Sequence, residues 1–109
     1  MAVRDELRQT YDEFRRIGFP ASATRSHQLG EIRTDLVEYD GHVAGIVESV
    51  LADAPIDISL LEPDRSLRAR LELLRENSSA PTNAEAAEYL RYLARLDEML
   101  DLANAGNPG

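Results

Sequence analysis

A long run of apolar residues spaced three and four positions apart constrains the fold of this chain more than any other feature. The run extends from about Thr24 to Asp53, and its apolar members are Leu29, Ile32, Leu36, Tyr39, Val43, Ile46 and Val50. This spacing places the side chains on one side of an α-helix. A helix of about 30 residues would be about 45 Å long. We therefore expect one long central helix against which shorter helices pack.

Glycines are the weak point of this predicted helix. Gly30, Gly41 and Gly45 lie inside it, and each glycine costs a helix about 1 kcal/mol relative to alanine. The pair Asp40-Gly41 is also typical of a tight β-hairpin turn. We predict a continuous helix, with a kink or a hairpin at Asp40-Gly41 as the alternative.

Three further segments have helical periodicity, and each ends or begins with a recognisable signal. They extend from Val3 to Ile17, from Pro63 or Asp64 to about Glu76, and from Thr82 to about Ala103. Short links join them to the long helix. The sequence therefore predicts an all-α fold, a four-helix bundle with one long, central helix. We expect one helical domain over residues 1–105 and a frayed tail over 106–109.

The composition excludes several classes of protein. Apolar residues make up 43% of the chain and charged residues 29%, which is typical of a folded globular domain. The chain has no cysteine, which excludes disulfides, thiolate metal sites and a cysteine nucleophile. Nowhere does an apolar run approach the roughly 20 residues that span a bilayer. We expect a cytoplasmic protein that does not associate with membranes.

Negative charge is concentrated in the middle of the chain. The net charge is −8, and the segment from Glu31 to Asp64 holds nine carboxylates against the single cation Arg33. The rest of the chain is balanced, with eleven acidic and eleven basic residues. Nucleic acid is therefore excluded as a ligand, because phosphate binding requires a basic surface.

This acidic segment favours a non-catalytic interaction module that binds a basic partner protein. The carboxylates expected to face the partner are Glu31, Asp35, Glu38, Asp40 and Glu48. An adaptor, an assembly factor and an inhibitor of the immunity-protein or antitoxin type all fit this description. The chain contains no phosphate-binding loop and no serine elbow of a hydrolase. We expect neither catalysis nor a cofactor.

A metal site is the alternative function. On the long helix His27, Glu31, Glu38 and His42 fall on one stripe, so two imidazoles and two carboxylates share a face. Imidazole and carboxylate groups are ordinary ligands of transition metals. This pattern would make the chain a small helical metal-binding protein.

The last predicted helix is apolar over an unusually wide arc. A surface helix usually buries a stripe of about 100°, whereas Leu90, Tyr92 and Met99 widen the apolar arc of this helix on both sides of its seam. Either the helix lies at the centre of the fold, or these three residues contact a second copy of the chain. In the second case we expect a homodimer.

One flank of the long helix is nearly bare of side chains. Gly41, Gly45 and Ser49 recur every four residues, and Ala52 follows. Such a flank allows another helix to approach closely. The crossing helix could belong to this chain or to a partner.

Overall fold

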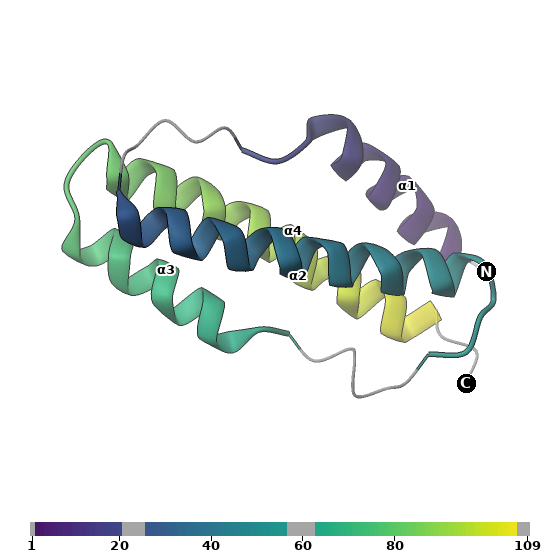
Figure 1. Cartoon of the computed structure of the whole chain (residues 1–109). Helices are drawn as coiled ribbons and strands as arrows, with labels where there is room; N and C mark the ends of the chain where they lie inside the picture. Colours follow the sequence, from purple (N-terminus) through teal and green to yellow (C-terminus); the bar gives the residue numbers. More distant parts are fainter. Residues whose placement is uncertain (1, 21–25, 57–62, 107–109) are drawn as a thin grey trace.

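Four α-helices make up the regular structure of the chain (Figure 1). The computed structural model describes residues 2–20, 26–56 and 63–106. The helices are α1 (Ala2–Ile17), α2 (His27–Leu51), α3 (Arg65–Asn77) and α4 (Thr82–Gly106). No strand occurs in the described ranges, which confirms the predicted all-α, four-helix fold. Gly106 ends α4, and the rest of the predicted tail lies outside the described residues.

The long helix α2 is continuous over 25 residues, so the hairpin alternative at Asp40-Gly41 is wrong. Ser26 begins the helix, because its side-chain oxygen accepts a hydrogen bond from the Leu29 amide at 3.3 Å. All seven residues of the predicted apolar stripe are buried. Burial of each large apolar side chain contributes about 1.5–3 kcal/mol, which outweighs the cost of about 1 kcal/mol for each glycine.

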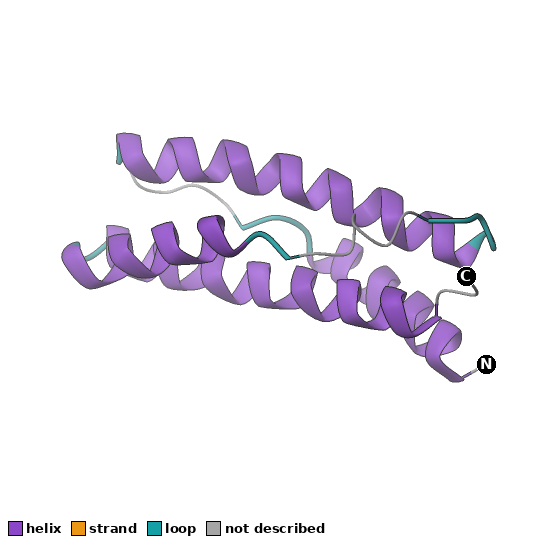
Figure 2. Ribbon diagram, turned by 90° about the horizontal axis from the view of Figure 1, so that it is seen from below, coloured by secondary structure: helices purple, strands orange, loops and turns teal. Residues whose placement is uncertain are grey.

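The helices α2 and α4 run parallel to each other at the centre of the molecule, and α1 and α3 flank them on opposite sides (Figures 1 and 2). Both flanking helices run antiparallel to the central pair. Among the described helices, α4 makes the most extensive contacts with the other three. The whole molecule is flat, with principal extents of 45 × 27 × 17 Å. No helix of the described residues is both long and apolar enough to span a bilayer.

The chain consists of two halves with the same plan, a short helix followed by a long one. Tyr39 of α2 and Tyr92 of α4 are 53 residues apart, and both are buried. The buried pairs Val43 with Leu96, Val47 with Leu100 and Val50 with Ala103 have the same separation. Much of the core therefore repeats: a buried residue of α1 or α2 often has a buried counterpart in α3 or α4, 53 residues later. Few residue identities accompany this repeat, so the sequence did not reveal it.

The wide apolar arc of α4 is covered within the chain. Tyr92 is 5% exposed and Met99 is 0% exposed, while Leu90 is half-buried and packs against the core. Tyr92 and Met99 therefore do not form the exposed self-association surface that was one of the two alternatives. The physical reason is the central position of α4, which surrounds this helix with three neighbours. Of the two interpretations of its wide arc, the structure shows the central helix.

Candidate functional site

A polar cluster of the buried residues Asp40 and Tyr92 with the more exposed Arg15 joins α1, α2 and α4. The Arg15 guanidinium donates from Nη2 to Asp40 Oδ1 at 2.5 Å, and the Tyr92 hydroxyl donates to the other carboxylate oxygen. Asp40 is only 7% exposed. Both of its oxygens are engaged inside the molecule, so the prediction that Asp40 faces a basic partner is wrong.

The position of Asp40 along α2 explains why this residue is buried. It follows Leu36 by four residues and precedes Val43 by three, which is the spacing of the apolar stripe itself. The carboxylate is stabilised there by charge-assisted hydrogen bonding. In turn, the hydrogen bond to Asp40 raises the pKa of the Arg15 guanidinium above its usual value.

A second cluster of the same composition lies on the other side of the central pair. The Tyr39 hydroxyl donates to Asp97 Oδ1 at 2.7 Å, and Arg68 Nη2 donates to Asp97 Oδ2 at 2.6 Å. This cluster joins α2, α4 and α3. Arg15 and Arg68 are 53 residues apart, as are the two tyrosines, whereas the two aspartates are 57 residues apart. The clusters therefore correspond in composition and in the helices that they join, but the aspartates occupy different positions in the two halves.

A third polar cluster surrounds Arg33 of α2. Arg33 Nη1 donates to the Pro20 carbonyl at 2.7 Å and to the Tyr89 hydroxyl at 2.6 Å. That hydroxyl donates to Glu85 Oε1 at 3.0 Å, and the guanidinium lies over the Phe19 ring at 4.6 Å. Each of the three clusters connects different helices through satisfied hydrogen bonds. Their role is therefore to fix how the helices pack.

We expect the two buried tyrosines to make the fold sensitive to alkali. Burial, and secondly the hydrogen bonds to Asp97 and Asp40, raise the pKa of Tyr39 and of Tyr92 above the usual value of 10.0. The protonated phenols thus stabilise the fold fully below about pH 10, and this contribution is lost as the pH rises toward their folded pKa values.

Chemical denaturation at about pH 9 and about pH 11 measures this effect. The free energy of unfolding should fall between these values more in the wild type than in the double variant Tyr39→Phe/Tyr92→Phe. Equal falls in the two proteins would contradict the assignment.

Most carboxylates of the predicted acidic face are engaged but still accessible. Glu31 pairs with His27 at 3.0 Å, Asp35 pairs with Arg70 at 2.6 Å, and Glu48 accepts from the Tyr11 hydroxyl at 3.1 Å. No ion pair or hydrogen bond of Glu38 occurs among the described residues. Glu31, Glu38 and Glu48 are exposed, so three of the five predicted carboxylates lie open to solvent.

The four predicted metal ligands do not converge. His27 and His42 are 15 residues apart on one continuous helix, which corresponds to about 22 Å along the helix axis. Within the described ranges, no group of three or more histidine or acidic side chains could hold a metal ion. The predicted set of His27, Glu31, Glu38 and His42 therefore forms no shared site, because only neighbouring turns of a helix bring ligands together.

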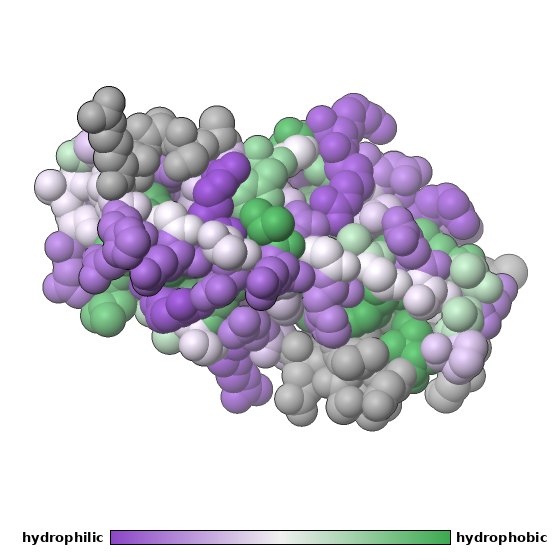
Figure 3. Space-filling model, in the orientation of Figure 1, coloured by the Kyte–Doolittle hydropathy of each residue, from purple (hydrophilic) through white to green (hydrophobic). Residues whose placement is uncertain are grey.

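One side of α2 is covered by no other helix, and we call it the outward face. Its exposed residues include His27, Gly30, Glu31, Thr34, Val37, Glu38, Gly41, Gly45 and Glu48. Figure 3 shows residues of near-neutral hydropathy following α2 across the molecule, with strongly hydrophilic side chains beside them. The small-residue flank that we predicted is on this face, so no helix of the described residues crosses it.

The glycines of the outward face have no packing requirement inside the molecule. Apart from its chain neighbours and the nearby backbone of α2 itself, a Cβ added at Gly30, Gly41 or Gly45 would meet no atom within 4 Å. Beside Gly41 and Gly45 lies a hollow of about 400 Å³, whose other lining residues are His42, Ile46, Ser49, Pro55 and Ile56. Val37 is 51% exposed on the same face. The backbone of α2 is therefore accessible along much of its length.

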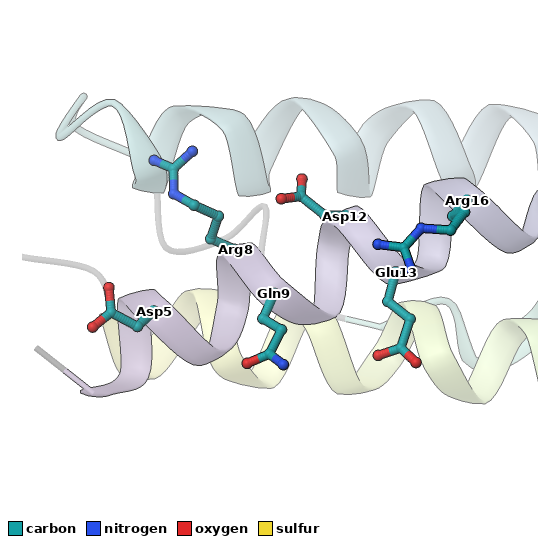
Figure 4. A pocket seen from close by; sticks show the side chains of 6 residues that line it. All are labelled: Asp5, Arg8, Gln9, Asp12, Glu13 and Arg16. Atoms are coloured by element: carbon teal, nitrogen blue, oxygen red, sulfur yellow. The ribbon is translucent and has the colours of Figure 1, made fainter.

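A strip of alternating charges on α1 is not a comparable site. Its lining residues are Asp5, Arg8, Gln9, Asp12, Glu13 and Arg16 (Figure 4). All six come from one helix, and no second element encloses the space between them. This strip is an ordinary solvated helix surface.

Comparisons with protein-family models, with curated proteins and with solved structures give no match to this chain. Function therefore has to be inferred from the chemistry of its own surfaces. We focus on the outward face of α2, because its exposed glycines and its exposed Val37 have no role in the packing described above.

Proposed function

We propose that this protein is a non-catalytic interaction module that binds a basic helix of a partner protein along the outward face of α2. The observation that carries the proposal is the set of three exposed glycines on this face. Each glycine destabilises an exposed helix by about 1 kcal/mol relative to alanine. Nothing inside the molecule requires them, since added Cβ atoms would find open space. Close approach of an external backbone gives them a role.

The charges of the outward face favour a basic partner. Glu31, Glu38 and Glu48 are exposed on it. The single cation of α2, Arg33, is turned inward toward Tyr89 and Pro20. Arginine or lysine side chains on a docked helix would meet carboxylates without a competing positive charge. Such complementarity speeds association and selects partners.

The hollow beside Gly41 and Gly45 supplies an anchor point. Its walls include the apolar side chains of Ile46, Pro55 and Ile56. A large side chain of the docked helix would fit there, and buried anchors of this kind carry much of the energy of an interface. An adaptor, an assembly factor and an inhibitor that covers a basic surface would all use such a face.

We expect Gly41→Ala/Gly45→Ala to stabilise the free protein while weakening the complex. Each alanine should add about 1 kcal/mol to the free energy of unfolding, because both sites are helical and have room for a Cβ. Chemical denaturation measures this gain. A loss of stability would contradict the view that these positions are free inside the molecule.

Binding can be tested with a designed amphipathic helix of alanine, leucine and arginine, about 20 residues long. We expect it to shift the amide resonances of the outward face, more strongly at low salt. A peptide with glutamate in place of arginine should not bind. Gly45→Leu should weaken binding, whereas Ala94→Leu is the matched control, since Ala94 is exposed on α4. Equal binding by both variants would overturn the proposal.

A further inference from the structure

A second hollow lies where the end of α1 meets α4. Its volume is about 390 Å³. Phe14, Ile17, Phe19 and Pro20 form its apolar wall, and α4 lines the opposite wall with Glu88, Arg91, Tyr92 and Arg95. It shares no residue with the outward face of α2.

The apolar wall is fixed by local structure and does not depend on a ligand. Gly18 adopts a φ of +81°, which favours glycine, and its amide donates to the Phe14 carbonyl at 3.1 Å to end α1. This turn places the Phe19 ring against Tyr92, with a centroid distance of 4.6 Å. Preformed concave surfaces of this kind are typical of binding sites.

An exposed apolar side chain marks the lip of the hollow. Ile17 is 65% exposed, the highest value among the exposed large apolar side chains of the described residues. It ends α1 directly beside the aromatic wall. A ligand with an apolar group would remove this side chain from water.

The opposite wall is positively charged, although the protein as a whole is acidic. Arg91 and Arg95 are one turn apart and exposed, and neither forms an ion pair in the part of the chain that the structure describes. Only one carboxylate, Glu88, lines the hollow with them. Two guanidinium groups against one carboxylate leave a net positive charge. An arginine binds a carboxylate with two parallel hydrogen bonds.

We propose that this hollow binds an acidic segment of a partner protein in which an apolar side chain lies next to a carboxylate. The apolar side chain packs against Ile17 and Phe19, and the carboxylate accepts hydrogen bonds from Arg91 or Arg95. The occupant has the opposite charge to the helix proposed for α2. The two proposals are therefore independent, and either can fail alone.

The test uses two capped fluorescent peptides, Gly-Glu-Leu-Glu-Gly and its glutamine counterpart Gly-Gln-Leu-Gln-Gly. Nuclear magnetic resonance titration should show the glutamate peptide shifting signals of Ile17, Phe19 and Arg91. The glutamine peptide should bind about tenfold more weakly, the change expected for loss of charge-assisted hydrogen bonds.

Two pairs of variants separate the site from general effects of charge and apolarity. Arg91→Glu/Arg95→Glu should weaken binding of the glutamate peptide at least about tenfold, whereas Arg65→Glu/Arg75→Glu makes the same charge change on α3 and should not. Ile17→Asp should also weaken it, whereas Leu73→Asp should not, because Leu73 is 61% exposed but on α3. Circular dichroism checks that all four variants remain folded.

Three results would overturn this proposal. The first is the absence of binding by the wild type at millimolar peptide. The second is an equal loss in the α3 control variants, which would indicate general charge attraction. The third is a wild-type dimer that Arg91→Glu/Arg95→Glu dissociates, which would assign the hollow to a second copy of the chain.

Discussion

Replacing both Tyr92 and Met99 with glutamate is expected to unfold the protein at 25 °C. Both side chains lie in the core, with exposures of 5% and 0%. Each buried carboxylate costs several kcal/mol unless it is paired, and the whole free energy of unfolding of a domain is about 5–15 kcal/mol. Two such charges on α4 would therefore remove most or all of the free energy of unfolding. Circular dichroism and sedimentation of the double variant measure the outcome.

The matched control places the same two charges on the surface. Leu73→Glu/Ala94→Glu changes two exposed residues and should leave the helical spectrum intact. A folded, monomeric Tyr92→Glu/Met99→Glu variant of a dimeric wild type would show that these residues contact a second copy. That result would contradict the burial described above.

Asp40→Ala should destabilise the protein by about 2–4 kcal/mol. The substitution removes the acceptor of two hydrogen bonds, leaving the buried Tyr92 hydroxyl without its carboxylate. Arg15 is affected less, because 38% of its side chain is already exposed and can be hydrated. Chemical denaturation measures the loss. Glu38→Ala is the control, since an exposed carboxylate on the same helix should change stability by about 0.5 kcal/mol or less.

A double-mutant cycle tests whether Asp40 and Tyr92 act as a unit in their polar cluster. Asp40→Ala and Tyr92→Phe together should cost less than the sum of their separate effects, because the two residues share one hydrogen bond. Strict additivity of the two changes would mean that this bond contributes nothing to stability.

The helices could be predicted from the sequence because burial follows periodicity. The stripe from Leu29 to Val50 is buried as predicted, and α2 extends through Asp40-Gly41 because that stripe stays in phase across the glycine. The wide apolar arc of α4 was equally consistent with a central helix and with a self-association surface. Only the number of neighbouring helices, which is a tertiary property, separates them.

The polar clusters could not be predicted in the same way. Arg15, Arg33 and Arg68 find their partners on helices far away in the sequence. Local spacing contains no information about which side chains of other helices meet them. Asp40 is the exception, since its phase with Leu36 and Val43 already indicated burial. Its negative charge led us to group it with residues such as Glu38, which lies on nearly the opposite side of the helix.

The candidate site was predicted in part. The small-residue flank and the carboxylates Glu31, Glu38 and Glu48 do share an exposed face. The sequence could not show whether another helix of the chain covers this flank, because that depends on where α1 and α3 pack. Arg91 and Arg95 gave no signal, since an exposed i,i+4 pair on a helix is common in any bundle.

The division into two similar halves, α1 with α2 and α3 with α4, determines how the chain can unfold. Each of the three polar clusters takes members from both halves: Tyr92 completes the cluster of Arg15 and Asp40, Tyr39 completes that of Arg68 and Asp97, and Arg33 reaches Tyr89. Neither half alone supplies every partner of its polar groups, and neither covers its own apolar stripe. We therefore expect that neither half is stable without the other, and that the chain unfolds in a single cooperative step.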